Sequence, residues 1–508
     1  MSFEWTVFSV CIVVLHVCGA GAAAHAIMTV RNSQSAVAWA ISLVLIPYFT
    51  LFPYLLFGRS RLSPHPSLPI KLDRFPIQSI DDQSGRDGSY SALQGELSRF
   101  QALAGLSGSP VLPNNSVRLL VNGIETFNVL FAALANAQHT IYLQCFTVHH
   151  DILGKQLRDL LCERALAGVR VYFLYDRVGS HKLPRTYIRI LQANGVYTQA
   201  FSAGKYWRNP LRINFRNHRK LVIIDHHIAF LGGLNIGTTY LDAHPRLSPW
   251  RDTHLEVKGK VVGVLITSFV QDWFWMTSSL PNDFIDYVQS NVGGGEIQSD
   301  RQNHDVIKVQ EHGGDASSVQ YRAVAANVLC QALASGPSDA KETCLLFFVA
   351  AINSASKRIW LASPYFIPDD AIRIALQLAV LRGVDVCLLL PGLADHRTVY
   401  AASSLYAYDI LRAGVKVYRY QPGFMHQKVV LIDDAIAAIG SANLDNRSFR
   451  LNFELTLMVF DSIFAKQVEA MLEQDFAQSS LISATEYQQA PIWKKFAMHV
   501  AKLFSPIL

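Results

Sequence analysis

The chain has 508 residues, of which 50% are hydrophobic and only 17% are charged. A soluble enzyme is usually less apolar, so we expect a membrane segment or a large core, and two lobes with an accessory segment. The net charge of +6 favours anionic partners without separating lipid headgroups from nucleic acid. The 7 cysteines show no CxxC spacing, and no motif calls for a metal, a nucleotide or another cofactor.

Two apolar stretches near the amino terminus, residues 6–28 and 36–57, contain no Asp, Glu, Lys or Arg. Each is long enough to cross ~30 Å of hydrocarbon, so residues 1–75 are predicted to be a membrane anchor with two transmembrane helices. A cleaved signal peptide is disfavoured because the first residues carry Glu4 and no basic side chain. Arg31 alone separates the stretches, whereas several basic residues follow the second. The positive-inside rule then predicts a multi-pass protein with its amino terminus and body in the cytoplasm.

Residues 76–112 are rich in Ser, Gly, Gln and Asp, which is typical of a flexible linker. The following sequence reads twice, and the repeat divides it into lobes at residues 113–300 and 301–486. Each copy contains the pattern HxKxxxxD, with a glycine seven and an asparagine ten residues after the aspartate. The motif residues are His218, Lys220, Asp225, Gly232 and Asn235 in the first copy, and His426, Lys428, Asp433, Gly440 and Asn443 in the second.

Both copies also agree in the order of their predicted elements, which is strand, helix, strand, helix, strand. This order predicts an α/β fold in which two pseudo-symmetric lobes carry mixed β-sheets flanked by helices. Because side chains alternate along a strand, the histidine and lysine of each motif share one face. Asp225 and Asp433 belong to the motif but stand where each hairpin turns, so a structural role is favoured over a catalytic one.

The motifs resemble the HKD signature of the phospholipase D superfamily over about residues 115–480. Finer matches, among them RNHRKLVIID, WRDTHLEV, LPGLADHR and SANLDNRSFRLNFE, are similar to the bacterial cardiolipin synthase family. The resemblance implies a phosphatidyltransferase of the bacterial inner membrane that joins two phosphatidylglycerols into cardiolipin and releases glycerol. It implies anionic membrane lipids as partners, no nucleic acid, and no metal or other cofactor.

An exchange reaction must hold a phosphatidyl group between two alcohols, which a covalent phosphohistidine achieves. A second imidazole then serves as acid and base. The resemblance assigns the nucleophile to His218 and the acid/base to His426, while the repeat leaves the reverse assignment open.

Charge on the phosphate oxygens calls for cationic and neutral donors, and Lys220, Lys428, Asn235 and Asn443 meet that need. Glu256 and Glu454 resemble the family carboxylates that orient the histidines. Their spacing from the histidine differs between the copies, 38 against 28 residues.

Residues 487–508 form an amphipathic tail with aromatic and basic residues at helical spacing. It is able either to lie on an anionic membrane or to dock on the second lobe. Hydrolytic phospholipase D, a membrane-tethered nuclease and a catalytically silent adaptor are the alternative functions. Phosphatidylethanolamine as second substrate, acyl preference and the oligomeric state, a homodimer included, also stay open.

Overall fold

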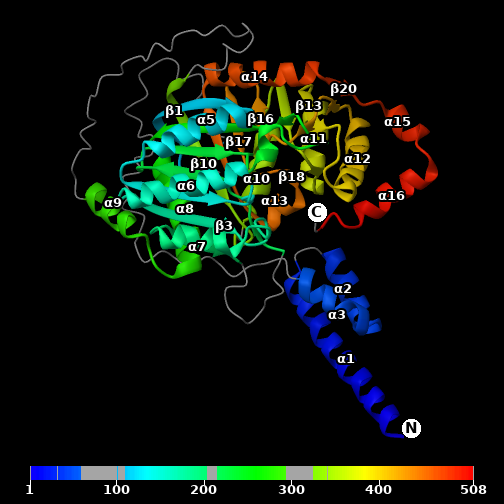
Figure 1. Ribbon diagram of the computed structural model, residues 1–508. Helices are drawn as coiled ribbons and strands as arrows, with labels where there is room; N and C mark the ends of the chain where they lie inside the picture. Colours follow the sequence, from blue (N-terminus) through cyan, green and yellow to red (C-terminus); the bar gives the residue numbers. More distant parts are fainter. Residues whose placement is uncertain are drawn as a thin grey trace.

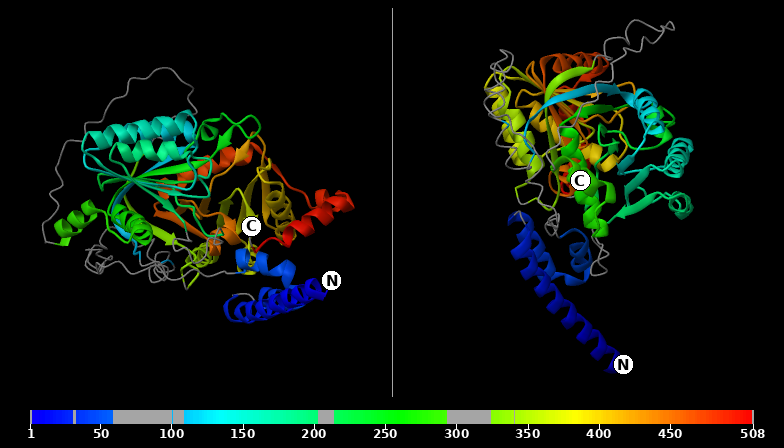
Figure 2. Two further views of the ribbon diagram at one scale, coloured as in Figure 1. Left: turned by 60° about the horizontal axis from the view of Figure 1, so that its bottom comes forward. Right: turned by 90° about the vertical axis from the view of Figure 1, so that its left-hand side faces the viewer.

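The computed structural model describes residues 2–30, 33–58, 100, 109–202, 214–292, 324–339 and 341–506. Most of the predicted linker lies outside the described residues, and so does the predicted boundary between residues 300 and 301. Figures 1 and 2 show a body built on a sheet, with the amino-terminal helices projecting from one side.

One continuous sheet of 16 strands runs through both halves of the body. The first half contributes β1 (Leu112–Val121), β2 (Thr140–Cys145), β3 (Arg170–Asp176), β4 (Tyr197–Phe201), β5 (Arg216–Asn217), β6 (Leu221–Ile224), β7 (Ile228–Gly232) and β9 (Thr253–Gly259). The second half contributes β10 (Ala325–Ser335), β11 (Arg358–Ala362), β13 (Asp385–Pro391), β14 (Lys416–Tyr420), β16 (Val429–Ile432), β17 (Ile436–Gly440), β19 (Asn452–Phe460) and β20 (Ser479–Leu481).

The pairing pattern confirms the predicted repeat and the predicted mixed sheet. In the first half β2, β3 and β4 are parallel, and β6, β7 and β9 continue from β2 as antiparallel strands. The second half repeats this pattern with β11, β13 and β14, followed by β16, β17 and β19. The antiparallel pair of β1 and β10 joins the halves, so the two lobes share one sheet.

Helices cover both faces of the sheet. One apolar core spans both halves and packs under α8 (Val261–Thr277) and α14 (Ser462–Ala477). The opposite face carries a separate core in each half. Its helices are α5 (Asn122–Ala135), α6 (Ile152–Leu166) and α7 (Arg185–Ala193) in the first half, and α10 (Thr343–Ser354), α11 (Asp370–Leu381) and α12 (Arg397–Leu411) in the second. A further helix, α9 (Asn282–Val292), follows α8.

Among the described residues of the anchor, one helix is long and apolar enough to cross a membrane, α1 (Ser2–Thr29). The single helix expected over residues 36–57 is not formed. Two short helices replace it, α2 (Ser33–Leu45) and α3 (Pro47–Phe57), because proline at the start of α3 lacks the N–H that would continue α2. Each is shorter than the roughly 20 residues that a spanning helix needs.

The contacts of α2 and α3 with α1 show how the two short helices run. A side chain at Gly19 would meet Leu43 and Pro47, so the end of α2 lies at the middle of α1. The chain then returns, because His25, nearer the end of α1, hydrogen-bonds the hydroxyl of Tyr54 at 2.6 Å. The second apolar stretch is therefore a helical hairpin whose two ends lie near the body-proximal end of α1 (Figure 1).

Two helices form the tail, α15 (Ala484–Gln489) and α16 (Ile492–Lys502). α16 packs on α12, with Met498 and Ala501 buried. Lys502 forms an ion pair of 3.1 Å with Asp409 of α12. The tail is therefore docked on the second half, as one of the two sequence alternatives proposed.

Candidate active site

His218 follows a two-residue strand that belongs to the first half but pairs with the second. This strand, β5 (Arg216–Asn217), runs parallel to the start of β19. The backbone N–H of His218 continues the pairing by donating to the carbonyl of Phe453 at 2.9 Å. The register brings the imidazole to Glu454, whose carboxylate oxygens lie 2.9 and 3.0 Å from His218 Nδ1.

His426 has the mirrored arrangement. Its strand β15 (Phe424–Met425) runs parallel to β8 (Trp250–Arg251) of the first half. The backbone N–H of His426 donates to the carbonyl of Arg251 at 2.7 Å, and its Nδ1 lies 2.8 Å from the carboxylate of Asp252. Each histidine is therefore oriented by a carboxylate from the opposite half of the chain.

Both carboxylates are fully buried and are held by further donors. The hydroxyls of Ser441 and Ser448 donate to Glu454 at 2.5 and 2.8 Å. The backbone N–H of Thr253 donates to Asp252 at 2.8 Å. Such bonds fix the carboxylates in place, so that each imidazole keeps Nδ1 towards its carboxylate. Lys428 Nζ also lies 2.9 Å from Nδ1 and 3.2 Å from Nε2 of His426.

The motif lysines lie beside their own histidines. Lys220 Nζ donates to the carbonyl of His218 at 2.7 Å, and Lys428 Nζ donates to the carbonyl of His426. Burial lowers the pKa of Lys220 to about 8, against the attraction of Glu454. Burial also lowers the pKa of Lys428 to about 7, against Asp252 and with the help of the positive charge of Lys220. An incoming phosphate anion would restore both charges.

The motif lysine of each half also acts on the histidine of the other half. Burial lowers the pKa of His218 to about 4, and Lys428 of the other half adds to the effect. Burial and Lys428 lower the pKa of His426 to about 4, and Lys220 of the other half adds to that shift. Both imidazoles are therefore neutral at pH 7. Glu454 and Asp252 oppose the lowering of the pKa, because each carboxylate favours the protonated form of its histidine.

Aromatic rings form part of the walls around the imidazoles. The ring of Phe146 lies 4.9 Å from that of His218, and the ring of Trp250 lies 5.2 Å from that of His426. Lys220 Nζ also stands 5.3 Å above the ring of Phe146. These apolar surfaces keep the dielectric low, which strengthens each charge interaction in the site.

The two motif asparagines are buried next to the site and already hold parts of the backbone and neighbouring side chains. Asn235 accepts from the N–H of Thr147 at 3.2 Å and donates to the hydroxyl of Tyr240 at 3.0 Å. Asn443 donates to Asp445 at 3.2 Å. Each amide has a second N–H, so a phosphate contact is compatible with these bonds.

The motif aspartates lie at the hairpin turns and not beside the imidazoles. Asp225 accepts from three consecutive backbone N–H groups at residues 138–140, at 2.7 to 2.8 Å. Asp433 accepts in the same way from residues 356–358, at 2.7 to 3.2 Å. Both have φ of 50°, in the left-handed region that Asp tolerates in turns. The favoured structural reading agrees with these contacts, and a direct catalytic role does not.

Glu256 does not hold an imidazole, contrary to the expectation. Its carboxylate lies 3.2 Å from Lys258 and 3.8 Å from Arg118, four residues along β9 from the place that Asp252 occupies. Residues four apart point to the same face of a strand, but they are separated by about 13 Å along it. Glu256 therefore cannot reach the position that Asp252 occupies.

The strand pairing that follows each motif identifies Asp252 as the counterpart of Glu454. The motif glycine pairs with His254 in the first half and with Thr456 in the second. Counting back two residues from these partners gives Asp252 and Glu454. The hairpin between glycine and carboxylate is six residues longer in the first copy, which hides the match in the sequence.

The arrangement brings two neutral imidazoles, two buried ammonium groups and two orienting carboxylates together. One imidazole Nε2 is able to attack phosphorus while the other exchanges a proton with an alcohol. The lysines provide positive charge for the phosphate oxygens. This set of groups suits phosphodiester exchange.

Comparison with known proteins agrees with this chemistry. The family model described as cardiolipin synthase, PLD-like domain, matches residues 130–258 and again 348–476. A second model, described as phospholipase D-nuclease N-terminal, matches residues 20–59.

Full-length relatives and a solved structure extend the comparison. Cardiolipin synthase A of Pseudomonas entomophila is 47% identical, with 99% of this chain and 98% of that protein covered. Cardiolipin synthase A of Pseudomonas syringae is 48% identical, with 97% of each covered. The phosphatidylserine synthase of Haemophilus influenzae shares the fold at a TM-score of 0.59 and 16% identity, covering 80% of this chain and 99% of that one. With the two matched repeats and these relatives, the chain belongs to the cardiolipin synthase family of phospholipase D-like phosphatidyltransferases.

Proposed function

We propose that this enzyme transfers a phosphatidyl group from one phosphatidylglycerol to another, giving cardiolipin and glycerol. The observation that carries the proposal is the crossed pairing of His218 with Glu454 and of His426 with Asp252, around two buried lysines. In both imidazoles Nδ1 faces a carboxylate. One imidazole is therefore able to hold the phosphatidyl group while the other exchanges a proton with the leaving alcohol and then with the incoming alcohol.

In the first step His218 Nε2 attacks phosphorus, and the bond from phosphorus to the glycerol oxygen breaks. The bound phosphate anion raises the pKa of His426, so this imidazole carries a proton at Nε2 in the complex. It gives that proton to the glycerol oxygen, and glycerol leaves. In the second step the neutral His426 removes a proton from the hydroxyl of the acceptor lipid. That oxygen attacks phosphorus, the bond to His218 breaks, and His426 is protonated again. Lys220 and Lys428 stabilise the phosphate oxygens throughout.

Lipid products give the direct test. Purified full-length enzyme in phosphatidylglycerol vesicles should form cardiolipin and glycerol in equal amounts. Phosphatidic acid as the main product would instead establish hydrolysis, with water replacing the acceptor. Cardiolipin formed faster when phosphatidylethanolamine is added would identify that lipid as the second substrate.

Trapping identifies the nucleophile. Enzyme denatured at neutral pH with sodium dodecyl sulfate should carry radioactive label from the phosphate or acyl chains of the donor, but none from its headgroup glycerol. His218→Ala should abolish this label, whereas His426→Ala should slow its appearance. The reverse result would assign the nucleophile to His426. Loss of neither turnover nor label in the two variants would refute the mechanism.

For the membrane arrangement we propose that α1 crosses the inner membrane once and that the α2–α3 hairpin enters it from the side of the body. Support comes from the return of α3 along α1 and from the charges. Arg31 and the basic residues that follow α3 then lie on one side, opposite Glu4. The body is cytoplasmic, as the sequence predicted, but the amino terminus is periplasmic.

Cysteine accessibility separates this arrangement from two full crossings. Single cysteines are introduced at Ser2 or Asn32 in a chain in which Cys11 and Cys18 are serine. A membrane-impermeant maleimide added to intact cells should label position 2 and not position 32. Labelling of position 32 alone would establish two crossings. An introduced cysteine at Ile463, which is exposed on α14 of the body, should react only after the cells are opened.

A further inference from the structure

α16 presents two opposite faces, and only one of them is used for docking. Met498 and Ala501 are 5% exposed and pack towards α12. A different set of large apolar side chains stands in solvent on the remaining surface. This exposed face consists of Ile492, Trp493, Phe496, Val500, Leu503 and Phe504, with exposed fractions of 85%, 72%, 69%, 37%, 77% and 48%.

The position of this helix is fixed by polar bonds at its carboxyl end. Besides the ion pair of Lys502, the hydroxyl of Tyr406 donates to the hydroxyl of Ser505 at 3.1 Å. The side chain of Asn446 donates to the carbonyl of Ser505 at 3.2 Å. Docking therefore does not bury the exposed face, so the two readings of the tail do not exclude one another.

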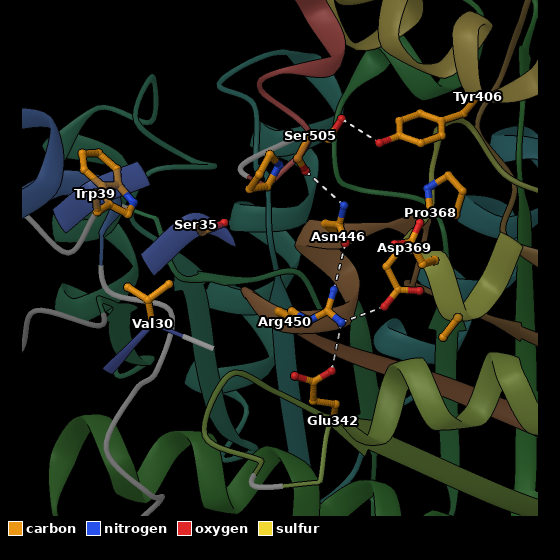
Figure 3. A pocket seen from close by; sticks show the side chains of 13 residues that line it. Val30, Ser35, Trp39, Glu342, Pro368, Asp369, Tyr406, Asn446, Arg450 and Ser505 are labelled. Atoms are coloured by element: carbon orange, nitrogen blue, oxygen red, sulfur yellow. Dashed lines mark hydrogen bonds and ion pairs between the residues drawn. The ribbon is translucent and has the colours of Figure 1, made fainter. Parts of the chain in front are cut away.

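The end of the tail lies next to the carboxyl end of α1 and the start of α2. Ser505 and Pro506 line a cavity of about 510 Å³ together with Val30, Ser35 and Trp39 of the anchor (Figure 3). Val30 directly follows α1, and Ser35 lies in the first turn of α2. If α1 spans the bilayer, these residues stand at the membrane–water interface, and α16 stands beside them.

Charge on the tail fits an anionic surface. Lys494, Lys495, His499 and Lys502 lie within α16, and the helix carries no acidic residue. Lys494 is exposed and makes no ion pair among the described residues. Tryptophan and phenylalanine on one face with lysine beside them are typical of helices that lie at the headgroup level.

We infer that α16 lies in the interface of the anionic bilayer with its exposed apolar face inserted, as a second membrane contact beside the anchor. The contact holds the body against the lipid surface from which its substrates come. The orientation of α16 is independent of the reaction assigned above.

The test uses the full chain in vesicles of phosphatidylglycerol and phosphatidylcholine. Cys11 and Cys18 are replaced by serine, and the five cysteines of the body are buried. An environment-sensitive fluorophore is attached to Phe496→Cys, or to Ile463→Cys as the control. Ile463 is 64% exposed on α14, which lies on the side of the body away from the anchor (Figures 1 and 2).

The label at position 496 should brighten about threefold on reconstitution and be quenched by lipids that carry a doxyl group near the headgroup. The label at position 463 should do neither. Brightening at 496 without lipid quenching would mean that protein, such as a second copy of the chain, covers this face, and it would overturn the inference. No response at 496 would overturn it too. Because the readout does not need turnover, it stands apart from any failure of the proposed reaction, and retained lipid products confirm that the labelled chain is folded.

Discussion

Replacing Asp252 with asparagine tests the part of the site that the crossed pairing predicts. The carboxylate is 0% exposed and lies 2.8 Å from His426 Nδ1. The change keeps the shape of the side chain but removes its charge. The asparagine N–H₂ group is also able to face Nδ1, and this would turn the imidazole to the wrong tautomer.

The expected loss follows from two effects. A hydrogen bond to a charged group contributes about 1.5 to 3 kcal/mol, which corresponds to roughly 10-fold to 150-fold in rate. The wrong tautomer of an acid/base histidine raises the loss towards ~10⁴ in kcat. We therefore expect Asp252→Asn to lower kcat between about 10² and 10⁴. Phosphoenzyme should still form slowly, because His218 keeps its bond to Glu454.

Glu256→Gln is the matched control. Both carboxylates come from the same WRDTHLEV segment, but Glu256 faces Arg118 and Lys258. Such partly exposed pairs contribute at most about 1 kcal/mol, so activity should stay within about threefold. The assay is cardiolipin formation at saturating phosphatidylglycerol, with circular dichroism to confirm folding. Asp252→Asn retaining more than about a tenth of the activity, or Glu256→Gln losing a hundredfold, would refute the crossed arrangement.

Three further predictions concern stability and pH. Asp433→Ala removes an acceptor of three backbone N–H groups, so the free energy of unfolding should fall by about 2 kcal/mol. At low temperature, where the variant stays folded, kcat should change by less than about threefold. A loss of kcat without a loss of stability would contradict the turn role. Burial lowers the pKa of His254 from 6.5 to about 4, so its stabilising effect is complete above pH 6.5 and is lost as the pH falls towards 4. His254→Gln should therefore weaken the fall in unfolding free energy between pH 7 and pH 5 by about 2 kcal/mol, and an unchanged slope would refute it. The pKa values of about 7 for Lys428 and about 8 for Lys220 predict that kcat/KM falls from pH 7 to 8. The fall of kcat should begin at a higher pH, because bound phosphate restores both charges. A fall of kcat and of kcat/KM at the same pH would contradict this.

The sequence by itself determined the repeat, the α/β class and which side chains are the candidates for the reaction. These features depend on local order. Two copies of HxKxxxxD with the same glycine and asparagine offsets fix which side chains share a strand face and where each hairpin turns. The turn role favoured for Asp225 and Asp433 needed only the turn chemistry of aspartate.

The tertiary structure alone decided which groups meet. Whether the sheets of the two halves merge, and which carboxylate orients each histidine, depends on pairing between strands more than 170 residues apart. The two-residue strands β5 and β15 carry no periodic pattern of their own, so their register with β19 and β8 cannot be found locally. For the same reason the apolar residues 36–57 satisfied a length rule for a spanning helix, while one proline and the packing against α1 turned them into a hairpin.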